Sequence, residues 1–214
     1  NYNRLSYSSE FPWMADGANG EVAMNYTFKK ADEGWKALSV YRFKRFEQEV
    51  YYREAWLRND TDIEFQLADI LLPDGVLRVD KAMSVNPVEA HLGHYALPHL
   101  TNTIKEKTIK KHGYTAYVIE NEKHQLAMVP LYGWKEVGFE HTSGLHPESD
   151  ECTVLNAKEI FTGEKIFVTL LLWNKAGMKV DNKRLFPVKD VLVSHDKKSV
   201  TVLLNDGTRK EVVW

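Results

Sequence analysis

Apolar and polar side chains alternate along much of this chain with a period of two. The clearest example spans residues 35–79, where alternating runs occupy residues 35–46, 49–57, 63–67 and 76–79. Because successive side chains of an extended chain point to opposite faces of a sheet, this period predicts strands. Turn-forming residues separate the runs, at 58–62 and again at 73–75. The stretch therefore predicts an antiparallel meander.

The same pattern returns in shorter runs on both sides of the meander. We expect further strands at residues 5–9, 22–28, 114–119, 125–131, 152–160, 164–173, 188–194, 199–204 and 209–213. Segments 81–99 and 133–150 are interrupted by glycine and proline and are interpreted as irregular. No run of helical period is long enough for a convincing helix. The pattern predicts an all-β fold, a large antiparallel β-sandwich of two packed sheets with little helix. A closed barrel is the alternative.

Length and charge limit the number of domains and the kinds of partner. A chain of 214 residues is a common size for a one-domain sandwich, so residues 1–214 are expected to form a single domain. With 28 basic and 30 acidic residues the net charge is −2, so we expect neither a nucleic-acid nor a membrane partner. The longest apolar run, 166–173, is far shorter than the ~20 residues of a transmembrane helix. The basic run 105–111 is interpreted as a solvated edge strand.

The cysteine content and the first residues bear on the compartment. Cys152 is the single cysteine, which excludes an intramolecular disulfide and leaves both cytosol and periplasm open. The sequence begins at Asn1 without an initiator methionine or the apolar segment of a signal peptide. We interpret the chain as a mature protein or an excised piece of a longer one. A periplasmic or extracellular location is favoured over a cytoplasmic one.

Histidine is the most unevenly distributed residue. Five of the eight histidines lie in the two segments interpreted as irregular: His91, His94, His99, His141 and His146. A zinc site needs three or four converging ligands, and the chain contains no HExxH or CxxC motif. We therefore expect these histidines to hydrogen-bond to loops or to line a polar cleft, without a bound metal. A small metal-dependent enzyme that uses these segments is the alternative.

Two tryptophans are candidates for contact with a sugar. Trp13 and Trp134 lie in expected loops, and an aromatic face can stack on a pyranose ring, although packing in the core is the competing interpretation. Glycosidases need two carboxyl groups, and Glu148, Asp150 and Glu151 beside the last of the clustered histidines form the best local group, which a solvated loop also explains. No GxSxG, GxGxxG or Walker sequence occurs, so we expect no cofactor.

Several short segments together resemble a known family. They are residues 5–9 leading into a glycine-rich loop, 71–79 followed by 93–99, and 144–147 running into 152–155. These segments resemble the C-terminal β-sandwich of the bacterial domain-of-unknown-function family 2264, classed with glycoside hydrolase family 154. The resemblance implies an N-terminal α/α-barrel before the sandwich, the layout also seen in heparinase-like polysaccharide lyases. This chain lacks that barrel, so no catalytic residue is carried over.

The resemblance leads to one favoured hypothesis about function. The chain would be an accessory β-sandwich of a carbohydrate-active enzyme that packs on the α/α-barrel of its parent protein. Segments 11–20, 89–99 and 134–150 would face the cleft and contact an oligo- or polysaccharide. By itself the chain is not expected to be catalytic. A free-standing carbohydrate-binding module is the alternative.

Overall fold

A computed structural model shows an almost entirely β-stranded protein, which confirms the predicted fold class. The structure describes residues 26–30, 35–47, 50–57, 60–72, 75–99, 104–122, 124–146, 149–175 and 182–214. The first half of this part contains β1 (Tyr26–Lys30), β2 (Trp35–Glu47), β3 (Val50–Leu57), β4 (Asp60–Leu72), β5 (Gly75–Pro98) and β6 (Lys105–Lys111). The second half contains β7 (Tyr114–Glu120), β8 (His124–Tyr132), β9 (Glu136–His146), β10 (Ser149–Lys175), α2 (Asn182–Leu185), β11 (Val188–Val193), β12 (Ser199–Leu204) and β13 (Arg209–Val213).

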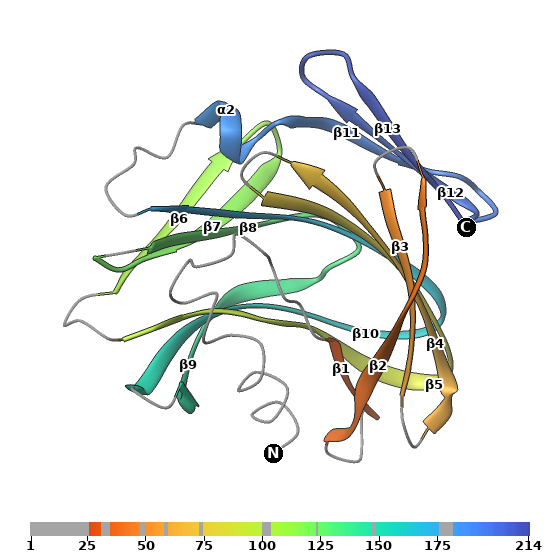
Figure 1. Cartoon of the computed structure of the whole chain (residues 1–214), viewed down its shortest axis with the longest axis horizontal. Helices are drawn as coiled ribbons and strands as arrows, with labels where there is room; N and C mark the ends of the chain where they lie inside the picture. The colour runs from red at the N-terminus through yellow and green to blue at the C-terminus, as the bar shows by residue number, and fades with distance from the viewer. Residues whose placement is uncertain are drawn as a thin grey trace.

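These strands form two antiparallel sheets. The ten-stranded sheet has the order β1-β2-β3-β4-β5-β10-β8-β7-β6, and β9 pairs with β10 beside this path. The predicted meander is confirmed as β2 to β5, and the basic run is confirmed as the edge strand β6. Strands β11, β12 and β13 form the second sheet. Figure 1 shows the large sheet curving back over itself, so that the layer containing β9 faces the layer containing β6, β7 and β8.

The two longest strands, β5 and β10, run through both layers of the curved sheet. They contain 24 and 27 residues and pair from Cys152 opposite Pro98 to Leu172 opposite Gly75. Their register shifts twice, between Leu155 and Ala157 and between Phe161 and Gly163. Because an extra residue bends a strand and increases its twist, these bulges allow β5 and β10 to curve.

The interpretation of segments 81–99 and 133–150 as irregular was wrong. Most of the first segment belongs to β5, and most of the second belongs to β9 and the start of β10. Pro87 and Gly93 each lie in one of the two register shifts between β5 and β10, where a missing N–H or side chain disturbs no regular pair. The two strands expected at 152–160 and 164–173 are likewise one continuous strand, β10, bent at Gly163 (φ 75°).

The main hydrophobic core lies between the two sheets. Buried side chains of the large sheet, such as Leu77, Val79 and Val168, pack in one cluster with Val200 and Val202 of the small sheet. The other face of the large sheet is also buried, because its two layers face each other: Phe167 and Leu171 alternate along β10 with the residues of the first cluster and are fully buried. Among the described residues no helix has the length and apolar character that crossing a membrane requires.

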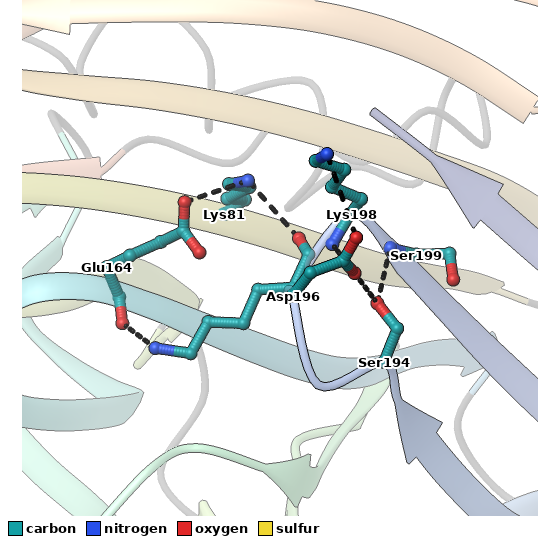
Figure 2. Close-up of polar contacts among 7 residues, drawn as sticks. Lys81, Glu164, Ser194, Asp196, Lys198 and Ser199 are labelled. Atoms are coloured by element: carbon teal, nitrogen blue, oxygen red, sulfur yellow. Dashed lines mark hydrogen bonds and ion pairs between the residues drawn. The ribbon is translucent and has the colours of Figure 1, made fainter.

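Polar contacts fix the small sheet on the large one. Lys81 of β5 lies 2.8 Å from the Glu164 carboxylate of β10, and its Nζ also donates to the Lys197 carbonyl at 3.2 Å. Lys197 Nζ in turn donates to the Glu164 carbonyl at 2.6 Å. Figure 2 shows this group beside the turn between β11 and β12, in which Ser194 and Asp196 hydrogen-bond to each other. The turn is therefore tied to both long strands.

Candidate functional site

Two of the histidines singled out in the sequence lie close together although they come from different strands. His99 follows β5 and His141 lies midway along β9, on opposite sides of β10. Their ring centroids are 6.4 Å apart. The residue between them is Thr153 of β10, whose backbone partners His141 and whose Oγ1 lies 2.6 Å from His99 Nε2. The curved sheet therefore joins two segments that the sequence left separate.

Two carboxylates complete this group, which we call the histidine cluster: His99, His141, Glu106, Glu151 and Thr153. Glu106 Oε1 of the edge strand β6 lies 2.9 Å from His141 Nε2. Glu151 lies at the start of β10; its carboxylate is 4.0 Å from His99 Nδ1, and its carbonyl accepts a hydrogen bond from the His99 N–H at 3.0 Å. A carboxylate that holds one imidazole nitrogen orients the ring and fixes where its proton resides.

The histidine cluster is accessible to solvent. The side chains of His141 and Glu151 are 66% and 76% exposed, whereas that of His99 is 24% exposed and Thr153 is fully buried. The buried hydroxyl thus fixes one ring while the other projects outward. An exposed imidazole can donate to or accept from a ligand hydroxyl and, when protonated, can bind an anionic group. The arrangement suits contact with a polar, hydroxylated ligand.

The remaining predicted residues are only partly described. Trp13 lies outside the described residues. His91 and His94 lie in β5, where His91 is paired with Lys158, and His146 ends β9 opposite Ser149, but their side chains lie outside the described part. The structure therefore places His91, His94 and His146 in strands rather than in the loops that we expected.

Trp134 lies in the short connection between β8 and β9, and it packs against the protein itself. Its ring stacks on Phe167 with centroids 4.1 Å apart and planes inclined by 22°, and its Nε1–H donates to Thr169 Oγ1 at 2.7 Å. The connection begins at Gly133, where φ is 89° and a side chain would meet the Ile166 carbonyl. At most one face of the indole is left for a sugar.

Among the described residues, no three or more His, Cys, Asp or Glu side chains are grouped so that they could hold a metal ion. In the histidine cluster, each imidazole is engaged by a protein partner. His141 is held by Glu106, and His99 is held by Thr153. The contacts observed are those of hydrogen-bonded histidines.

Sequence reasoning missed Glu106 and Thr153. Glu106 is the acidic residue within the basic run 105–111. Nothing in the sequence around Glu106 indicates that β6 lies close to β9. Thr153 is an ordinary polar residue in an alternating strand. The one available signal was that Thr153 and Glu151 lie two residues apart in β10 and therefore face the same side, next to the second histidine segment.

Comparison with known proteins shows which fold this is. No protein-family model and no curated protein matches the sequence. Among solved structures, a mutant of the heparan sulfate lyase HepC from Pedobacter heparinus matches 88% of this chain with a TM-score of 0.57 and 12% identity. A heparinase III matches 88% of the chain with a TM-score of 0.55 and 10% identity. The chain spans only 30% and 29% of these two proteins. It therefore has the fold of one part of a much larger carbohydrate-active enzyme.

Proposed function

We propose that this chain is the accessory β-sandwich domain of a carbohydrate-active enzyme and packs on an α/α-barrel domain of the same parent protein. The observation that carries the proposal is the relation of sizes: 88% of this chain aligns with 30% of a heparan sulfate lyase. A unit that makes up about a third of a larger enzyme is one domain of it, and in this proposal it packs against a second domain that carries the catalytic groups. The resemblance to glycoside hydrolase family 154 adds the barrel to this proposal.

Exposed apolar side chains on the large sheet support packing on a second domain. Val85 of β5 lies within the register shift between Phe161 and Gly163, Ile160 of β10 lies one residue before it, and the two residues are 73% and 57% exposed. Exposed apolar groups that lie on one element pair of a domain are candidates for an interaction surface. We propose a periplasmic or extracellular location, because polysaccharides do not cross a lipid bilayer freely.

Within this proposal the histidine cluster lies in the cleft between the sandwich and the barrel. His141 projects outward from β9 and is held by Glu106, so it can hydrogen-bond to a hydroxyl or bind an acidic group of a glycan. The cluster is a contact site that supplements the catalytic groups of the barrel. It needs no cofactor.

The test compares the 214-residue chain with the complete product of its reading frame. Both are incubated with neutral, uronate-containing and sulfated polysaccharides. Elimination creates an unsaturated uronate that absorbs in the ultraviolet, whereas hydrolysis creates reducing ends without that absorbance. We expect the complete protein to depolymerise at least one of these polysaccharides and the 214-residue chain to depolymerise none of them. Activity of the 214-residue chain by itself, or a reading frame that encodes no helical domain beside it, would contradict the proposal.

The role of the histidine cluster is tested in the complete protein. His141→Ala should lower kcat/KM by about tenfold, the effect of losing one charge-assisted hydrogen bond. His195→Ala is the matched control, because His195 is an exposed histidine in the distant turn between β11 and β12. Equal activity of the two variants would remove the histidine cluster from the proposal and leave the domain assignment in place.

A further inference from the structure

A second polar feature lies on the opposite face of the ladder formed by β9 and β10. Side chains of successive residues alternate between faces, and Thr153 belongs to the face of the histidine cluster. Asn156 and Lys158 therefore belong to the other face, opposite Gly138 and Glu136 of β9 in the same register. These residues, together with Glu140, line a hollow of about 210 Å³.

Asn156 is the unusual member of this hollow. It is 2% exposed, and neither its Oδ1 nor its Nδ2 has a hydrogen-bond partner among the described residues. A buried amide without partners loses its hydration without compensation, and native proteins rarely tolerate this. Asn156 also lies in a register shift between β5 and β10, where two residues of β5 oppose one of β10. Bulges of this kind often re-aim a side chain beside a functional site.

Space is open beside Asn156 at Gly138, whereas the amide atoms themselves are covered, so a ligand reaches them only when a neighbouring side chain moves. Gly138 is the direct cross-strand partner of Asn156, and a Cβ atom there would have no heavy atom within 4 Å. Lys158 and Glu140 form an ion pair that spans the row occupied by Gly138 and Asn156. Both side chains are long and about one-third exposed, so the pair can open without moving the backbone. A second hollow of about 90 Å³ shares Glu136 and Lys158 and extends the space along the ladder.

We propose that this hollow, which we call the Asn156 hollow, is a binding subsite for an uncharged, hydroxyl-bearing ligand, namely a neutral glycan unit. An amide offers one acceptor and two donors, and a pair of neighbouring hydroxyl groups satisfies both kinds at once. Around the two hollows Glu136, Glu140 and Glu159 outnumber Lys135 and Lys158, so the local charge disfavours sulfate and carboxylate groups. The two hollows together approach the lower end of the ~300–1,000 Å³ range of small-molecule sites, which suits one sugar residue. The choice of a glycan over another polyol rests on the proposed function. The preference for a ligand with hydroxyl groups rests on the Asn156 amide and is independent of that function.

The test is a titration of the 214-residue chain with neutral oligosaccharides, sulfated and uronate-containing oligosaccharides, and sorbitol, followed by calorimetry. We expect a neutral oligosaccharide to bind and the acidic ones to bind at least about tenfold more weakly. Sorbitol binding as tightly as any sugar would replace the glycan by a general polyol. If no hydroxylated compound binds, the proposal is overturned.

Two variants separate a ligand site from a structural residue. Asn156→Leu should abolish binding and at the same time raise the melting temperature of the ligand-free chain, because it replaces a buried amide that has no hydrogen-bond partner among the described residues by an apolar group of similar size. Gly138→Leu should fill the hollow and abolish binding with little change in melting temperature. Asn121→Leu is the control: Asn121 is 6% exposed, but its Oδ1 accepts the His124 N–H at 2.8 Å, so its loss should lower the melting temperature.

The outcomes of these variants are decisive. A lower melting temperature for Asn156→Leu, comparable to that of the control, would show a structural role and overturn the proposal, as would unchanged binding in both hollow variants. The readouts need no enzymatic activity. If the complete protein proves inactive on polysaccharides, the proposed function fails while binding at the Asn156 hollow can still be observed.

Discussion

Arg78 forms a bidentate ion pair with Asp69 across two neighbouring strands in the interior of the large sheet. The two residues are direct partners in the ladder of β4 and β5, with Arg78 Nε 2.6 Å from Asp69 Oδ1 and Nη2 2.9 Å from Oδ2. The Arg78 side chain is 1% exposed. Asp80, two residues further along β5, lies 4.0 Å from the same guanidinium and is fully buried. An ionic group thus occupies the space between the two layers, where apolar residues are the rule.

Removing one partner of this pair should be strongly destabilising. Asp69→Leu leaves the buried guanidinium with less compensating charge, and we expect the free energy of unfolding to fall by about 3–5 kcal/mol. The loss of unfolding free energy should lie toward the lower end of this range, because the Asp80 carboxylate still compensates part of the Arg78 charge. Chemical denaturation followed by circular dichroism measures the change.

An exposed pair supplies the control for this prediction. Arg45 and Glu47 lie 3.2 Å apart with side chains 47% and 61% exposed. Glu47→Ala should therefore cost less than about 1 kcal/mol. Equal losses in Asp69→Leu and Glu47→Ala would show that the interior pair is solvated in solution.

The sequence pattern identifies the strands better than it identifies their lengths. The meander follows directly from alternation and turn residues, and the shorter strands β7, β8, β12 and β13 follow from alternation, because both signals are local. The length of β5 and β10 could not be predicted in this way. Pro87 and Gly93 are strand breakers in isolation, and only the pairing with β10 shows that each one lies in a bulge. The continuity of a strand through a bulge is a property of two strands rather than of one.

The candidate site shows the same limit. His99 and His141 were recognisable as members of two histidine-rich segments, but β5 and β9 do not pair with each other in the described part of the chain. They meet because β10 lies between them and Thr153 contacts one side chain and pairs with the other residue. Glu106 comes from the opposite layer. Such contacts depend on the curvature of the sheet, which no short sequence pattern encodes.

Trp134 should contribute to stability through its indole N–H. Trp134→Phe keeps an aromatic ring that can stack on Phe167 but removes the donor to Thr169, whose hydroxyl is buried. We expect the free energy of unfolding to fall by about 0.5–1.5 kcal/mol in a urea titration. The double variant with Thr169→Val should lose less than the sum of the single variants, because both sides of the same bond are then removed. Additive losses would indicate that the bond is not formed in solution.

Gly133 should tolerate no side chain. Its φ is 89°, and a Cβ atom would lie 2.1 Å from the Ile166 carbonyl oxygen, so Gly133→Ala combines backbone strain with a backbone clash. Gly113 serves to measure the backbone strain without the clash, because its φ is 82° and a Cβ atom there would meet nothing within 4 Å. Gly113→Ala should cost about 1–2 kcal/mol, and Gly133→Ala should cost clearly more. Thermal unfolding of both variants measures the difference, and equal melting temperatures would contradict this assignment of the clash.

Asp196 should make the stability of the turn between β11 and β12 depend on pH. Hydrogen bonds from the Ser194 hydroxyl and the Lys198 N–H lower the pKa of the Asp196 carboxyl from its ordinary value. Because the pKa is lower in the folded than in the unfolded chain, the ionised carboxylate stabilises the fold above the unfolded value of ~3.9. This stabilisation is lost as the pH falls from there through the lowered folded pKa. The unfolding free energy of the wild type should therefore exceed that of Asp196→Ala at pH 6, and the two should converge in acid. A difference that stays constant from pH 6 down to pH 2 would show that the hydrogen bonds do not depend on the charge of Asp196.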